Sequence, residues 1–118
     1  MKREPLELTG RALDWAVLSS VNFPMIGTQG FVHEGEDTAR YKRLCEPSRN
    51  WADGGPLIEK MKDAGNFMLA ASKDRCQATL CIGPNVWTAS GLTPLVAAMR
   101  CWVASRLGDE VEVPDELA

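Results

Sequence analysis

The chain is short of histidine, of basic residues and of long apolar runs. Its 118 residues include one histidine, and 13 Lys and Arg stand against 16 Asp and Glu, for a formal net charge of −3. This balance argues against a broad phosphate-binding face and against attraction to anionic lipid. Charged residues and a proline take the place of an apolar run at the start, so no secretory signal or membrane span is expected. The sequence predicts a cytoplasmic protein with no membrane contact. The acidic net charge also argues against nucleic acid as its partner.

The cysteines do not follow a metal-binding pattern. Cys76 and Cys81 are separated by four residues, which is not the usual zinc spacing, and His33 lies far from both. A chain without a secretory signal keeps its thiols reduced, and Cys101 falls within an apolar stretch. We therefore expect free structural thiols, no metal site and no cofactor.

The last quarter of the chain carries the clearest folding signals. Thr93 fits a helix N-cap, Pro94 the first helical position and Gly108 the left-handed C-cap. Between them, apolar residues recur at three- and four-residue steps: Leu95, Val96, Met99, Trp102, Val103 and Leu107. Residues 93–113 are thus predicted to form a central helix followed by a short strand at 111–113.

The other elements are predicted from weaker patterns. Thr9 can cap a first helix that runs to about Val21, with Arg11 and Asp14 on its polar face. Asp53 can cap a second helix that starts at Pro56, and strand-like runs cover 67–72, 77–82 and 86–89. The order predicts a single α+β domain over 1–118, with about three helices packed on one side of a small, mainly antiparallel sheet.

The helical pattern breaks down at 22–35, which is predicted to form a loop or a weak hairpin, and the segment 23–45 as a whole is predicted to be a variable loop insert. The basic stretch 40–49 overlaps the end of this insert and contains Arg40, Lys42, Arg43 and Arg49 beside Tyr41. These residues offer a weak nucleic-acid contact in an otherwise acidic chain.

Four blocks of the sequence resemble the NinX-like family of small tailed-phage proteins. They are LTGRALDWAV at 8–17, PSRNWADGGPLI at 47–58, GLTPLVAAMR at 91–100 and VASRLGDEVEVPDEL at 103–117. The chain differs from the family pattern by a longer piece at 23–44 and by Asn50, where the resemblance suggests an aspartate. The resemblance implies a phage or prophage product in bacterial cytoplasm and does not imply a mechanism.

The sharpest candidate site is the segment 51–56. Trp51, Asp53, Gly54 and Gly55 can place an aromatic ring beside bare backbone N–H groups at a helix start, which is a natural anion or ligand cradle. The alternative is an N-cap with a packed tryptophan, because a phosphate loop needs more glycines and a lysine. The aspartate would also repel an anion.

Two further residues are candidates for recognition. Trp15, with Arg11 and Asp14, can form a surface patch on the first helix, although an amphipathic helix with a rim tryptophan has the same pattern. Arg100 stands alone on a nearly apolar helix, where it can pair with a carboxylate or bind a ligand anion. The candidate carboxylates are Asp14, Asp53 and Glu59.

The sequence favours a protein-binding module over an enzyme, with a host or phage protein as its partner. The expected surface includes Trp51, Asp53 and Trp15, and no catalytic residue is predicted. The first alternative is a small-ligand binder or enzyme that uses 51–56. The second is a nucleic-acid accessory factor that uses 40–49. Formation of a homodimer is a further alternative, and either an exposed tryptophan patch or the strand at 111–113 can mediate it.

Overall fold

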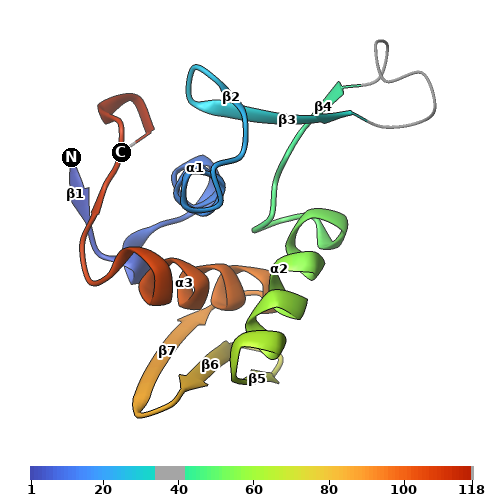
Figure 1. Ribbon diagram of the computed structural model, residues 1–118, viewed down its shortest axis with the longest axis vertical. Coiled ribbons are helices and arrows are strands. Elements are labelled where there is room, and N and C mark those ends of the chain that lie inside the picture. The colour runs from blue at the N-terminus through green and yellow to red at the C-terminus, as the bar shows by residue number, and fades with distance from the viewer. Residues whose placement is uncertain (34–41, 118) are drawn as a thin grey trace.

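The computed structural model describes residues 1–33 and 42–117, which form an α+β fold of three helices and three small antiparallel sheets (Figure 1). The helices are α1 (Gly10–Ser20), α2 (Trp51–Ala64) and α3 (Pro94–Leu107). Strands β5 (Asn66–Ala71), β6 (Cys76–Ile82) and β7 (Asn85–Gly91) form the largest sheet. The two others pair β1 (Lys2–Arg3) with β8 (Val111–Glu112) and join β2 (Met25–Ile26), β3 (Gln29–His33) and β4 (Lys42–Leu44). The predicted fold class is confirmed, although the strands divide among three sheets.

Helix α3 is the centre of the molecule, as predicted. It packs against the inner face of the β5–β7 sheet, and α1 lies on the opposite side of α3 (Figure 1). The Thr93 hydroxyl accepts a hydrogen bond from the Val96 amide at 3.1 Å, and Gly108 ends the helix with a φ of +88°. Met99 and Trp102 on α3 are buried, but Leu107, which was predicted to extend the same face, is 38% exposed in the last turn.

The β5–β7 sheet follows the predicted hairpin and third strand. Its register places Phe67 opposite Leu80, which in turn lies opposite Trp87. These residues face α3, and Leu80 is buried because the helix covers it. Every second residue therefore belongs to the core, and the residues between them face away from the helices.

The two ends of the described chain lie side by side (Figure 1). Val111 pairs with Arg3 in the β1–β8 sheet, which confirms the predicted C-terminal strand. The amino group of Met1 donates to the Val113 carbonyl at 2.8 Å and to the Glu112 carboxylate at 2.9 Å. A short 3-10 helix, η1 (Pro5–Glu7), then leads from β1 into α1, and a second, η2 (Asp115–Leu117), follows β8.

The segment predicted as an insert contains the hairpin β2–β3, and β4 adds to its edge. This ribbon lies beyond α1, away from the β5–β7 sheet (Figure 1). Gly30 fits tightly here, because a Cβ at this position would lie 2.8 Å from Leu18 Cδ1. Arg40 and Tyr41, which belong to the predicted basic stretch, lie outside the described residues.

Candidate functional site

Helix α2 begins earlier than predicted, and this changes the geometry of the segment 51–56. Asn50 is the N-cap, since its side-chain oxygen accepts a hydrogen bond from the Ala52 amide at 2.9 Å. The prediction that Asp53 caps the helix and that Pro56 starts it is wrong. Pro56 sits inside the helix, where it leaves the Ala52 carbonyl without its helical donor, and Ala52 is exposed to water.

The predicted backbone cradle does not form at the two glycines. The amides of Asp53 and Gly54 both donate to the Asn50 carbonyl, at 3.0 and 2.9 Å, so they already have partners within the first helical turn. Gly54 is buried, and a Cβ there would overlap the Pro47 carbonyl oxygen and lie 2.7 Å from Leu95 Cδ2. Gly54 therefore serves close packing between α2, its preceding turn and α3.

Asp53 is the anchor of that turn. Its carboxylate accepts two hydrogen bonds from the Arg43 guanidinium, both at 2.6 Å, and one from the Glu46 amide at 2.8 Å. Burial alone raises the pKa of Asp53, but the guanidinium and the amide outweigh it and hold that pKa below its usual value. Asp53 thus fixes β4 to α2 and does not face solvent.

We expect Asp53→Asn to destabilise the protein by about 1.5–3 kcal/mol at pH 7, because the charge-assisted bonds to Arg43 are lost. A lowered folded-state pKa means that this stabilisation is present above the ordinary aspartate pKa and is lost as the pH falls through the folded value. The gap between the variant and the parent should therefore begin to narrow below about pH 4 and close as the pH falls through the lowered pKa of Asp53. Urea unfolding at several pH values measures it.

The matched control for that experiment is Asp63→Asn, which changes an exposed carboxylate on the same helix. We expect it to shift the unfolding free energy by less than about 0.5 kcal/mol at either pH. An Asp53→Asn deficit that stayed constant through the acid range would contradict the role assigned to the ion pair with Arg43.

Asp14 also binds this turn, and it is buried, which corrects its predicted place on the polar face of α1. Its carboxylate accepts a hydrogen bond from the Ser48 amide at 2.8 Å and one from Arg49 Nη2 at 3.2 Å. Burial raises the pKa of Asp14, although both donors act against this shift. The predicted surface patch of Trp15 with Arg11 and Asp14 is therefore incomplete, since Trp15 is only half-buried but Asp14 is enclosed.

Arg100 does not form the predicted ion pair. Its Nε donates to the Leu8 carbonyl at 2.9 Å and its Nη1 donates to the Ser90 carbonyl at 2.8 Å. Partial burial lowers its pKa. The three candidate carboxylates pair elsewhere: Asp14 with Arg49, Asp53 with Arg43 and Glu59 with Lys62. Arg100 also lines a cavity of about 420 Å³ with Arg75 and Asp74.

The outer face of the β5–β7 sheet is not among the sites predicted from the sequence. Nine residues alternate with the core positions and share this face, and none of them is charged. They are Asn66, Met68, Ala70, Gln77, Thr79, Cys81, Val86, Thr88 and Ser90. Met68 is 58% and Val86 61% exposed. The alternation was readable from the sequence, but only the register shows that these residues form one surface, which we call the outer sheet face.

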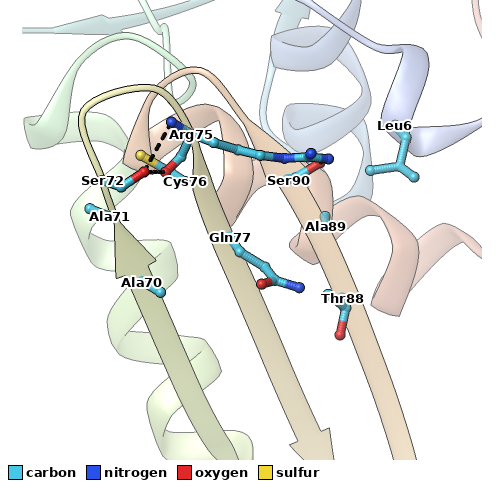
Figure 2. Close-up of a pocket in the computed structure, with 10 residues that line it drawn as sticks. All are labelled: Leu6, Ala70, Ala71, Ser72, Arg75, Cys76, Gln77, Thr88, Ala89 and Ser90. Carbon is cyan, nitrogen blue, oxygen red and sulfur yellow. Dashed lines mark hydrogen bonds between the residues drawn. The ribbon is translucent and has the colours of Figure 1, made fainter.

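A groove runs along the free edge of β7, between this strand and η1. One part has a volume of about 660 Å³ and reaches across the outer sheet face to Arg75. The other part, of about 450 Å³, extends to Glu4 and Asp109, and both parts include Leu6 and Thr88. Figure 2 shows Leu6 across from Ala89, and the Arg75 side chain crossing the sheet to Ser90. We call this feature the β7 groove.

The cysteines are free thiols, as predicted. Burial raises the pKa of Cys45 to about 12 and that of Cys101 to about 11, so both stay protonated at neutral pH. Within residues 1–33 and 42–117, no three Cys, His, Asp or Glu side chains are close enough together to hold a metal ion. No helix in this part of the chain has the length and apolar content to cross a bilayer.

Comparison with known proteins identifies the family. No curated protein matches the chain. The family model described as "Bacteriophage P22, NinX" matches residues 6–106, which span most of the 118-residue sequence and include three of the four blocks that resemble this family. The chain therefore belongs to the NinX family of bacteriophage proteins.

Proposed function

We propose that this NinX-family protein is a phage accessory protein that acts in the bacterial cytoplasm by binding another protein, of the host or of the phage. The observation that supports this most directly is the outer sheet face. One residue in four of the whole chain is charged, yet none of the nine strand residues on this face is charged, and Met68 and Val86 are exposed. A surface that lacks charged residues and exposes apolar side chains is typical of the centre of a protein interface.

The other two hypotheses find less support in the geometry. A ligand site in the segment 51–56 needs open amides, but the Gly54 amide is used within α2. A nucleic-acid site in 40–49 needs available cations. The Arg43 guanidinium, however, binds Asp53, and Arg49 pairs with Asp14 and Glu46. Carboxylates therefore neutralise part of the basic stretch.

Trp51 stays in the proposal as a second contact. It is the first residue of α2 and its side chain is 56% exposed, although tryptophan is among the most costly side chains to leave in water. The structure separates it from the outer sheet face, because α2 begins at the end of the molecule that carries β4 (Figure 1). A partner can therefore contact either surface alone, and variants can distinguish the two.

A pull-down of the tagged protein from host lysate, with and without phage infection, tests the proposal. We expect a stoichiometric partner whose recovery falls at least tenfold with Met68→Lys, because a buried unpaired ammonium disrupts an apolar interface. Ile26→Lys is the matched control, since Ile26 is 68% exposed on β2, away from the outer sheet face. Trp51→Ala tests the second surface. Equal recovery with Met68→Lys, Val86→Lys and Trp51→Ala, or no reproducible partner, would refute protein binding through these surfaces.

A further inference from the structure

The edge of β7 that lines the groove has unpaired backbone groups. The Ser90 carbonyl points away from β6, because it accepts a hydrogen bond from Arg100. Donors and acceptors of an antiparallel strand alternate between its two sides, so those of Val86 and Thr88 also point into the groove. The register agrees, since the Thr79 and Thr88 hydroxyls lie 3.4 Å apart, as expected for a pair without backbone hydrogen bonds. No other residue of the described chain bonds to the backbone of Val86 or Thr88.

Arg100 lies between the N-terminal segment and β7 at the Ser90 end of this edge. Its guanidinium lies between the carbonyls of Leu8 and Ser90 and bonds to both, so the N-terminal segment does not pair with β7 directly. Beyond Ser90, towards Val86, the space between β7 and η1 is the second part of the groove. A strand edge with unpaired backbone groups is a template for another strand.

The charges in the groove are divided between its ends. Arg75 lies at the Ser90 end, where its Nη2 donates to the Ser90 hydroxyl at 3.0 Å. Glu4 and Asp109 lie at the Val86 end. All three side chains are exposed, and within the described residues none has an ion-pair partner. Leu6, Thr88 and Ala89 line the middle of the groove without charge.

We propose that the β7 groove binds an extended segment of the protein partner, which adds to the sheet as a strand beside β7. The segment carries an acidic group that faces Arg75 and a basic group that faces Glu4 and Asp109. Its backbone pairs with Val86 and Thr88, and Leu6 covers its middle. At about 3.4 Å per residue, five to seven residues span β7. This inference rests on the proposed protein-binding function and specifies its partner.

Two blocked heptapeptides with a core of alternating threonine and valine serve as probes. One has lysine first and glutamate last, and the other has the reverse order, so the pair covers both strand directions. We expect one of them to produce saturable shifts of the Val86 and Thr88 amide resonances. No saturable shift with either peptide at millimolar concentration would overturn the proposal.

Variants at Thr88 separate the backbone from the side chain. Thr88→Pro removes the amide that points into the groove and leaves pairing with β6 in place, since an edge strand tolerates proline on its open side. We expect it to weaken peptide binding at least tenfold, whereas Thr88→Ala retains the amide and keeps binding within threefold. Arg75→Glu changes only an exposed side chain and should also weaken binding of whichever heptapeptide binds the parent protein. If the parent protein, Thr88→Pro and Arg75→Glu all bound the peptide with equal affinity, the proposed binding of a strand in the β7 groove would be overturned.

The same variants in the pull-down distinguish failure of this inference from failure of the proposed function. Loss of the partner with Thr88→Pro, and its retention with Thr88→Ala, supports the strand at β7. Retention with Thr88→Pro and loss with Met68→Lys overturns the groove while protein binding through the outer sheet face stands.

Discussion

Replacement of Met99 by aspartate is expected to abolish the folded state. Met99 is fully buried in the middle of α3, the helix that contacts the β5–β7 sheet, α1 and α2. The variant loses the packing of the methionine, at about 2–5 kcal/mol, and also buries an unpaired carboxylate, which costs several more. The whole domain is stable by only about 5–15 kcal/mol. Loss of the cooperative thermal transition in circular dichroism is the measurement.

Met68→Asp is the matched control, because it makes the same substitution on the outer sheet face, where the side chain is 58% exposed. We expect it to melt cooperatively and close to the parent protein. Trp102→Asp, on the same helix as Met99 and 2% exposed, should fail to fold in the same way. A soluble Met99→Asp protein with a cooperative transition would contradict the central position of α3.

The sequence predicts α3 and the β5–β7 strands well because their signals are local. Thr93, Pro94 and Gly108 mark the ends of α3 through the geometry of single residues, and each has the expected role in the structure. Strand alternation is likewise a property of neighbouring residues. These elements can therefore be predicted without knowing which parts of the chain they pack against.

The start of α2 was predicted wrongly because a contact distant in sequence decides it. A run of aspartate, two glycines and proline is typical of a turn followed by a helix start. Asn50 is an equally good N-cap, and the helix begins there with Gly54 packed against Leu95, 41 positions away. An aspartate, which the family resemblance suggests in place of Asn50, can make the same cap.

The partners of the charged residues also could not be predicted from local sequence patterns. Asp14 looked like part of a polar helix face, but its partners Ser48 and Arg49 come from another segment. Arg100 looked like half of a salt bridge, and its partners are two backbone carbonyls. Residue type alone does not show whether a guanidinium binds a carboxylate or a carbonyl, since both accept its hydrogen bonds.

The blocks that resemble the family contact one another. Asp14, in the block 8–17, binds Ser48 and Arg49 in the block 47–58. Gly54, in that second block, packs against Leu95 in the block 91–100, whose Arg100 returns to Leu8. These residues join the three helices to each other. The outer sheet face lies within 66–90, between the blocks. In this chain the shared pattern builds the scaffold, and the proposed binding surface belongs to the segment between.

The packing of α2 on α3 leads to a second large effect. Gly54→Ala is expected to lower the free energy of unfolding by about 3 kcal/mol, because its Cβ overlaps the Pro47 carbonyl oxygen and crowds Leu95. The leucine side chain can move, but the backbone carbonyl is held by the turn that Asp14 and Asp53 anchor. Urea unfolding measures the change.

Gly55→Ala, one position further along the same helix, is expected to have the opposite sign. A Cβ at Gly55 meets no atom within 4 Å, so the substitution adds only the helix preference of alanine over glycine, up to about 1 kcal/mol of stabilisation. Opposite signs at adjacent glycines require both residues to lie inside α2, one facing α3 and the other facing outward. If the two glycines instead formed an open loop before Pro56, both substitutions would have small effects of the same sign. That result would restore the predicted cradle and contradict the helix start at Trp51.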